Sequence, residues 1–374
     1  MSQRNNRIVM INNIPSPYYV DLCRTLQAKY PMYEFHFVFT SAAEGNRSWK
    51  AETEGLDHAS ILSSRVIRLK TRHDQRYIHF PGNIKKTLNE IDPAIVVAKE
   101  YNPAALSSLS WCRKKKRPYI HVTEGTLINE QNLNPIQKYS RRRIIHGADY
   151  CIAASTKAKE KLRYWNCPEE KIGVSYLTFD WEKLKKTERT PVPGRLLYVG
   201  SFAKRKGVDL LIQAVARLSV PYELHIVGNG TAEEESALKK QAALLGVSGK
   251  IRWCGYLEGE ALYREYAEAS AFVLATREDC FGLVLLEAAI KGVPIVSSCY
   301  ADGAYDIVEQ NVNGLIADPY DADSFAKAIE NVLTDPDYQR RAAEKDLSAF
   351  ALENTTEIYG TALARLLDGA GVLF

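Results

Sequence analysis

The chain has 374 residues, more than one hydrophobic core usually organises, so we expect two domains of similar size. Apolar residues make up 46% and charged residues 25% of the chain, a balance that indicates a globular protein and excludes a disordered or membrane-spanning one. The net charge of +4 is uneven: residues 1–190 hold 32 Lys and Arg against 19 Asp and Glu, or +13, and residues 191–374 hold 17 against 26, or −9. This split predicts domains with different partners.

The seven cysteines are scattered, odd in number and without a CxxC pair. They indicate reduced thiols and argue against a disulfide framework or a zinc cluster. The N-terminal stretch "MSQRNNRIVMINNIP" lacks an apolar segment of signal-peptide length, and the longest apolar runs are too short for a bilayer span. We therefore expect a cytoplasmic protein.

The positive charge of the first half is concentrated in "RKKKR" at 113–117 and "KYSRRR" at 138–143. Either run alone is typical of a solvated helix face, but the two together favour an anionic acceptor or peripheral contact with an anionic membrane. The sequence has no zinc-finger spacing, RNP-like aromatic motif or basic region leading into heptads. Nucleic acid is therefore not an expected partner.

Short apolar strands alternate with helical patterns through both halves, on either side of a Pro- and Gly-containing linker at 186–195. This alternation predicts an α/β protein with two doubly wound, Rossmann-like domains of parallel strands, facing each other across a cleft. In chain order, strands are expected at 7–14, 34–41, 94–100, 118–124, 148–155, 196–201, 223–230, 250–256, 271–276 and 294–299. Helices are expected at 19–30, 83–91, 103–115, 156–165, 207–218, 233–246 and 283–292.

Ligands of doubly wound sheets bind at the carboxyl ends of the strands. The strand "LLYVGS" leads into "FAKRKG", where Lys204, Arg205 and Lys206 precede a helix start and so form an anion site. Neither GxxxxGK[ST] nor GxGxxG follows the first strand of either half, which argues against a P-loop or a nicotinamide site.

The stretch "REDCFGLVLLEAAIKGVPIVSS" at 277–298 carries two acids at the same edge of the second sheet. Asp279 falls in the loop after a strand, and Glu287 falls about one turn into the next helix. Gly282 lets the backbone N–H groups of residues 281–283, at the positive end of the helix dipole, approach a ligand. One carboxylate suits sugar hydroxyls, the other a ribose, and the basic loop suits a diphosphate between them.

The motifs "DCFGLVLLEA", "KGVPIVSS" and "YVGSFAKRKGVDLLIQA" resemble those of the retaining glycosyltransferases of family 4, which have the GT-B fold. The resemblance is dense from about residue 195 to 335. It is looser in the first half, where "NNIPSPYYVDL" and "PYIHVTEG" carry it.

The resemblance implies roles for individual residues on the donor side. Glu287 would bind the ribose, and Asp279 would bind a sugar hydroxyl at the catalytic centre. The other donor-binding groups would be Lys206 for the diphosphate and the backbone of Phe281, Gly282 and Leu283. Ser201 stands where the family usually has an arginine, so Arg205 or Lys204 of the same basic loop would supply that positive charge, and we take Arg205 as the candidate.

On the acceptor side, Ser16, Tyr18 and Gly125 lie in strand-end loops of the first half. Glu124 stands where many family members carry a histidine near the reaction centre, and it is the second catalytic candidate. Whether Glu124 replaces that histidine is left open by the sequence.

The resemblance implies a retaining, metal-independent hexosyltransferase without a cofactor. It would move a sugar from a nucleoside diphosphate sugar to a glycan or lipid-linked acceptor, in surface polysaccharide or glycoconjugate synthesis. Residues 1–188 would bind the acceptor and 189–350 the donor, and a C-terminal helix at 351–374 would pack back toward the first domain. Two alternatives stay open: a nucleotide-sugar epimerase of the same fold, and an inactive partner subunit.

Overall fold

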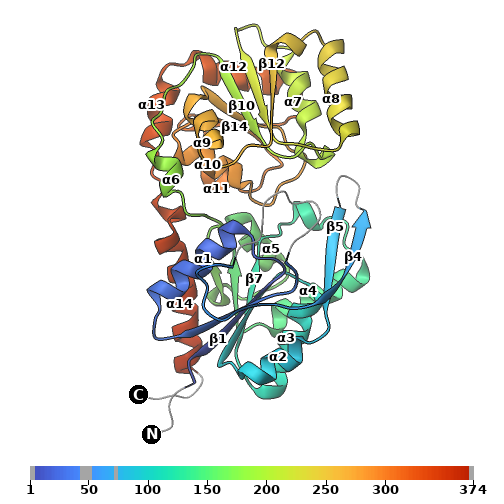
Figure 1. Cartoon of the computed structure of the whole chain (residues 1–374), viewed down its shortest axis with the longest axis vertical. Coiled ribbons are helices and arrows are strands. Elements are labelled where there is room, and N and C mark those ends of the chain that lie inside the picture. Colours follow the sequence, from blue (N-terminus) through green and yellow to red (C-terminus); the bar gives the residue numbers. More distant parts are fainter. Residues whose placement is uncertain (1–4, 43–52, 71–74, 370–374) are drawn as a thin grey trace. The chain divides into compact units, whose positions relative to one another are not determined.

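The computed structural model describes residues 5–42, 53–70 and 75–369, which form two compact units (Figure 1). The described residues up to Asp180, together with those from Ser348 onward, form unit 1, and Trp181–Leu347 form unit 2. The division after Asp180 precedes the predicted boundary at 188/189 by one short helix, α6 (Glu182–Lys186), which belongs to unit 2.

Unit 1 is built on a parallel seven-stranded sheet of order β3-β2-β1-β6-β7-β8-β9. Its strands alternate between two cores, as a sheet covered on both faces requires. On β1, for example, Val9 and Ile11 enter one core and Ile8 and Met10 the other. The strands are β1 (Arg7–Asn12), β2 (Glu34–Phe39), β3 (Ala59–Ile61), β6 (Ile95–Lys99), β7 (Tyr119–Thr123), β8 (Tyr150–Ala153) and β9 (Ile172–Val174).

Helices cover both faces of this sheet. One face packs against α1 (Pro17–Lys29) and α14 (Leu352–Gly369), which run side by side (Figure 1). Through Tyr359, Ala362 and Leu363, α14 contributes to the core of unit 1. The other face packs against α2 (Ile84–Ile91), α3 (Pro103–Lys115), α4 (Pro135–Gly147) and α5 (Thr156–Tyr164).

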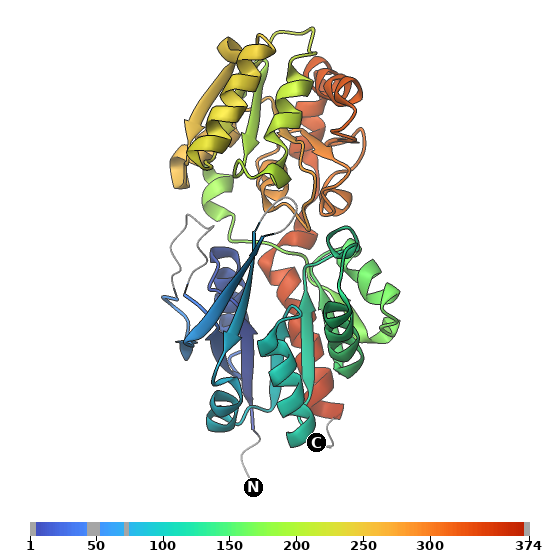
Figure 2. The same ribbon diagram turned by 90° about the vertical axis from the view of Figure 1, so that its right-hand side faces the viewer.

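A separate antiparallel hairpin of β4 (Ser64–Lys70) and β5 (Gln75–Pro81) lies outside this sheet (Figure 2). We did not predict it, because "SSRVIRLK" mixes arginines with apolar residues and lacks the continuous apolar run of a buried parallel strand. The apolar side chains of Val66, Ile67 and Phe80 are exposed on it.

Unit 2 repeats the architecture with a parallel six-stranded sheet of order β12-β11-β10-β13-β14-β15. Its strands are β10 (Arg195–Val199), β11 (Glu223–Val227), β12 (Ile251–Gly255), β13 (Ala271–Leu274), β14 (Ile295–Ser298) and β15 (Gly314–Ala317). Besides α6, its helices are α7 (Val208–Val215), α8 (Ala232–Leu244), α9 (Gly259–Glu268), α10 (Leu283–Ile290), α11 (Ala304–Ile307), α12 (Ala322–Thr334) and α13 (Asp337–Glu344). The chain also has short 3-10 turns, η1 (Ile128–Glu130), η2 (Glu169–Lys171), η3 (Lys204–Lys206), η4 (Ser248–Lys250) and η5 (Ser348–Phe350).

Each sheet reverses its strand order once, between β1 and β6 in unit 1 and between β10 and β13 in unit 2. The carboxyl ends of the strands beside such a switch point are where doubly wound folds bind ligands. The predicted α/β architecture is therefore confirmed, and it gives each unit one preferred site. Among the described helices, none is both long and apolar enough to cross a bilayer.

Candidate functional site

In unit 2 the basic turn η3 lies against the end of β13. Gly207 follows the turn with φ +69°, and a Cβ atom there would lie 1.9 Å from the carbonyl oxygen of Ala275. Only glycine allows this approach. Two hydrogen bonds fix the turn, because the Arg205 carbonyl accepts from the Arg277 N–H at 2.8 Å and from the Thr276 hydroxyl at 2.9 Å. The basic turn is thereby held beside the loop that carries Asp279.

The Asp279 carboxylate pairs with the cations of that turn. Lys206 Nζ lies 2.5 Å from Asp279 Oδ2, and an Arg205 guanidinium nitrogen lies 4.0 Å from the same oxygen. Only 12% of the Asp279 side chain and 18% of the Lys206 side chain are exposed, so solvent screens the pair weakly. Burial alone would raise the pKa of Asp279, but Lys206 and Arg205 lower it below its ordinary value. The acid is ionised at neutral pH.

The backbone around Asp279 is also fixed. Its N–H donates to the Tyr300 carbonyl at 3.0 Å, and its carbonyl accepts from the Asp302 N–H at 2.9 Å. The Phe281 N–H donates to Asp279 Oδ1 at 3.3 Å. Gly282 then takes φ +73° as the N-cap of α10, and Leu283 is the first residue of that helix. The expected loop, glycine and helix start are therefore all present in this order.

Glu287 lies one turn into α10 and has a partner that we did not predict. The hydroxyl of Tyr266, from α9, donates to Glu287 Oε2 at 2.5 Å. Burial raises the pKa of Glu287 above its ordinary value, and the Tyr266 hydrogen bond opposes that rise. Tyr266 comes from a different helix, so no local spacing could have revealed it.

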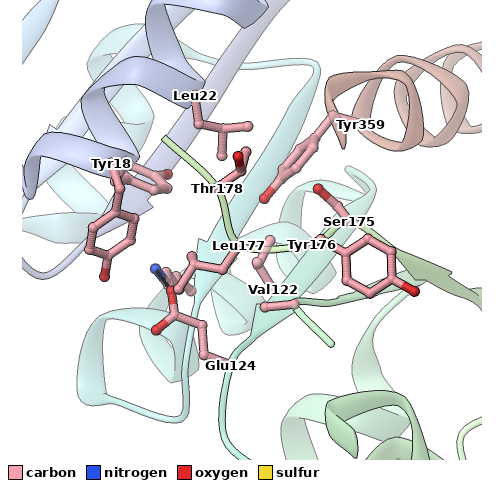
Figure 3. Close-up of a pocket in the computed structure, with 12 residues that line it drawn as sticks. Tyr18, Leu22, Val122, Glu124, Ser175, Tyr176, Leu177, Thr178 and Tyr359 are labelled. Atoms are coloured by element: carbon pink, nitrogen blue, oxygen red, sulfur yellow. Dashed lines mark ion pairs between the residues drawn. The ribbon is translucent and has the colours of Figure 1, made fainter. Parts of the chain in front are cut away.

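In unit 1 a pocket lies at the carboxyl ends of β6 and β7 (Figure 3). Its lining includes Tyr18, Leu22, Lys99, Glu124, Thr178 and Tyr359. In Figure 3, Tyr359 reaches into the pocket from α14, and Glu124 reaches in from the end of β7. The Thr178 hydroxyl is buried and has no hydrogen-bond partner among the described residues. The pocket thus joins aromatic side chains to polar groups.

Lys99 and Glu124 form an ion pair on one side of this pocket. Lys99 Nζ also lies 5.2 Å from the ring centre of Tyr18 and 5.1 Å from that of Tyr19. Burial alone would lower the pKa of Lys99, but Glu124 raises it above its ordinary value. Sequence analysis missed Lys99, although it is the next-to-last residue of the predicted strand 94–100, where a search of the strand ends would have found it.

A buried polar network supports the loop that follows β7. Glu100 accepts a hydrogen bond from the Glu124 N–H at 2.6 Å, and the fully buried Lys161 donates to Thr123 at 2.7 Å. A Cβ atom on Gly125 would lie 3.2 Å from Lys161 Nζ, so Gly125 packs on this network. Ser16 is the N-cap of α1, and its buried hydroxyl makes no hydrogen bond to the described residues. Of the acceptor-side candidates, Tyr18 and Glu124 line the pocket.

A second group of titratable side chains lies at the β11–β12 edge of unit 2. Potential ligand atoms of His225, Cys254 and Glu265 lie within 4.8 Å of one another. His225 Nδ1 lies 2.6 Å from Glu265, and Nε2 lies 3.1 Å from Glu223. Burial alone would lower the pKa of His225, but hydrogen bonds with Cys254 and Glu265, and the contact with Glu223, raise it to about 9. A charged imidazole between two carboxylates accounts for these contacts.

This raised pKa predicts a pH-dependent stability. The pKa of His225 is about 9 in the folded protein, against about 6.5 in an unfolded chain. Its stabilising effect is therefore complete below pH ~6.5 and is lost as the pH rises through about 9. We expect His225→Gln to lower the free energy of unfolding by about 2 kcal/mol at pH 6, and by much less at pH 10. Urea unfolding of both proteins at the two pH values measures this, and an equal difference at both would contradict it.

Comparisons with known proteins agree with this two-unit architecture. A family model described as "Glycosyltransferase Family 4" matches residues 17–182, and one described as "Glycosyl transferases group 1" matches residues 179–347. The structure of Anabaena Alr3699/HepE in complex with UDP is similar with a TM-score of 0.76 at 15% identity, over 96% of this chain and 99% of that one. This likeness shows the fold, which is GT-B.

The two family models together span both units, and the chain belongs to glycosyltransferase family 4. The lipopolysaccharide core biosynthesis glycosyltransferase LpsE of Rhizobium meliloti is 35% identical over 189 residues, which cover 50% of this chain and 53% of LpsE. The lipopolysaccharide 1,6-galactosyltransferase of Salmonella typhimurium is 24% identical over 307 residues, 80% of this chain and 79% of that protein. The match thus spans about half the length of LpsE. These relatives give the epimerase alternative no support.

Proposed function

We propose that this chain transfers a sugar from a nucleoside diphosphate sugar to a glycan or lipid-linked acceptor, with retention of the anomeric configuration. The observation that carries the proposal is the group in unit 2 where Lys206 and Arg205 meet Asp279 beside the start of α10. The two cations suit a diphosphate, Asp279 suits a sugar hydroxyl, and Glu287 suits the ribose. Family membership and the switch-point location support this assignment.

The chemistry follows from these groups. Breaking the bond between the sugar and the diphosphate leaves negative charge on the leaving group. Lys206, Arg205 and the backbone N–H groups at the start of α10 stabilise that charge in a largely buried site. The acceptor hydroxyl attacks from the face that the diphosphate leaves and gives its proton to the departing phosphate, so the new bond forms with the configuration retained. This route needs no side-chain nucleophile.

The acceptor binds in the pocket of unit 1, which Tyr18, Lys99, Glu124 and Tyr359 help to line. Tyrosine rings provide apolar faces for a sugar ring, and the Lys99–Glu124 pair provides polar groups for its hydroxyls. Glu124 takes the position of the family histidine. The two curated relatives described above are both named for lipopolysaccharide synthesis, which supports a surface polysaccharide or glycoconjugate as the product.

The test begins with a thermal-shift screen of UDP-, GDP- and ADP-sugars, because a donor raises the melting temperature by linkage. The donor that binds is then incubated with the protein and with lipopolysaccharide core or lipid-linked acceptors. NMR of the product shows the anomeric configuration. We expect transfer with retention. Inverted product would refute the retaining mechanism, and the absence of binding by any nucleotide sugar would refute the proposal.

Transfer is expected to proceed without a divalent metal, because side-chain cations and helix N–H groups hold the leaving group. Treatment with EDTA should therefore leave the transfer rate within about twofold of the untreated enzyme, a change of under 1 kcal/mol in the barrier. Initial rates measured before and after EDTA, and after adding magnesium or manganese, check this. Loss of activity that either metal restores would contradict it.

Peripheral membrane contact is the remaining part of this proposal, and the structure changes which residues support it. Arg141 is buried and pairs with Glu130 at 3.1 Å, so it is not available to a membrane. Arg142 and Arg143 are exposed on α4, which also exposes Ile136 (79%) and Tyr139 (64%). Basic residues near an anionic bilayer contribute about 1 kcal/mol each, and exposed apolar residues can insert at its surface.

We expect the protein to sediment with anionic vesicles at low salt, and much less with neutral vesicles or at high salt. An Arg142→Ser/Arg143→Ser variant should lower the binding free energy by about 2 kcal/mol. The matched control is Arg163→Ser/Arg340→Ser, which removes exposed arginines from other helices. Equal, negligible sedimentation with both vesicle types would refute membrane contact and leave the transferase proposal intact.

A further inference from the structure

We infer that the Asp279 carboxylate occupies the diphosphate site of the ligand-free protein, and that it thereby makes this site select nucleotides that carry a sugar over the bare nucleoside diphosphate. The inference rests on the proposed function and adds a selection step to the same site. Asp279 would then have two roles: it competes with the diphosphate for Lys206 and Arg205, and it binds the sugar.

Both carboxylate oxygens of Asp279 engage groups that the proposed function assigns to the donor. Oδ2 lies 2.5 Å from Lys206 Nζ and 4.0 Å from Arg205, and these are the two cations proposed for the diphosphate. Oδ1 accepts from the Phe281 N–H at 3.3 Å, and this N–H is one of the backbone groups proposed for the donor. A carboxylate and a phosphate are both anionic acceptors, so Asp279 satisfies these groups as a phosphate would.

The backbone of Asp279 is fixed beside these groups, and its side chain is largely buried there. Hydrogen bonds to Tyr300 and from Asp302 hold its backbone on both sides, and its side chain is only 12% exposed. Arg205 is restrained as well, since its guanidinium donates to the Glu278 carbonyl at 3.0 Å. A diphosphate that takes Lys206 and Arg205 therefore leaves the Asp279 carboxylate nearby, buried and without these cations. An unpaired buried charge, beside a like charge, is unfavourable.

A sugar on the diphosphate removes this penalty. Its hydroxyls can donate hydrogen bonds to the Asp279 carboxylate and so replace the lost contact with Lys206. The site should consequently bind the intact nucleotide sugar better than the nucleoside diphosphate that remains after transfer. This order of affinities favours release of the product after each turnover.

The test measures two dissociation constants by calorimetry, without acceptor, for wild type and Asp279→Asn. The ligands are the nucleotide sugar found in the screen and its nucleoside diphosphate. We expect Asp279→Asn to bind the nucleoside diphosphate at least about tenfold more tightly than wild type, and the nucleotide sugar less tightly. Asp279→Glu keeps the charge and should keep the wild-type order. Asp279→Ser, also uncharged, serves as a second variant if Asp279→Asn does not fold.

The control is Asp335→Asn, which removes another Asp–Arg contact of unit 2, the one with Arg341 at 2.7 Å, and should change neither constant. In a Lys206→Gln background, Asp279→Asn should tighten binding of the diphosphate less than it does in the wild-type background, because Lys206 is the nearer of the two cations for which Asp279 competes. Unchanged or weaker diphosphate binding by both neutral variants would overturn the inference and leave the proposed function standing. A wild-type protein that binds none of the nucleotides would overturn both.

Discussion

Replacing Glu287 with alanine should weaken nucleoside diphosphate binding by about 2–3 kcal/mol, or roughly 30- to 150-fold in Kd. This is the range for losing a hydrogen bond to a charged group. Glu287 lies on α10 with its carboxylate positioned by Tyr266 at 2.5 Å. A carboxylate held in one place accepts from ribose hydroxyls without further ordering. Calorimetric titration of both proteins with the same nucleoside diphosphate measures the difference.

The matched control is Glu330→Ala, which removes a hydrogen-bonded glutamate from α12 of the same unit. It should leave nucleotide affinity unchanged. Because burial raises the pKa of Glu287, wild-type affinity should also fall as the pH drops through that raised value, as the carboxylate gains a proton. An affinity unaffected by Glu287→Ala would mean that this carboxylate does not contact the ribose.

Replacing Gly207 with alanine should lower the free energy of unfolding by about 3 kcal/mol or more. Gly207 has φ +69°, and a Cβ atom would lie 1.9 Å from the Ala275 carbonyl oxygen. That oxygen belongs to the backbone after β13. The steric clash with the new Cβ atom can therefore be relieved only if the basic turn moves away from the Asp279 loop. Urea unfolding measures the loss. We expect nucleotide binding to weaken as well, since the turn carries Lys206.

Gly246→Ala separates the two causes of this loss. Gly246 has a similar φ of +72°, but no atom lies within 4 Å of the position that its Cβ would take. Only the left-handed backbone conformation is then unfavourable, at about 1 kcal/mol. Equal losses for the two variants would show that the backbone conformation, and not the contact with Ala275, makes Gly207 necessary.

The sequence by itself determined the architecture and the local geometry of the candidate site in unit 2. Continuous apolar runs such as 94–100 and 271–276 are typical of strands that are buried on both faces of a sheet. Because these runs alternate with helical segments along the chain, they predict doubly wound parallel sheets. The order of Asp279, Gly282 and Glu287 also determined a loop, a helix start and a helical face, because these are set by short-range spacing. Local geometry is encoded locally, so it could be predicted.

Only the tertiary structure decided which side chains meet. Lys206 and Asp279 are 73 positions apart, and their contact depends on Gly207 packing against the end of β13. Lys99 could pair with Glu124, and Arg141 could be buried against Glu130, only once neighbouring elements had folded together. The hairpin of β4 and β5 was likewise missed, because it lies outside the buried sheets whose apolar runs were sought. The pattern of apolar residues along a chain indicates which faces of a helix or strand are buried. The partner of a charged side chain depends instead on how elements that are distant in the sequence pack together.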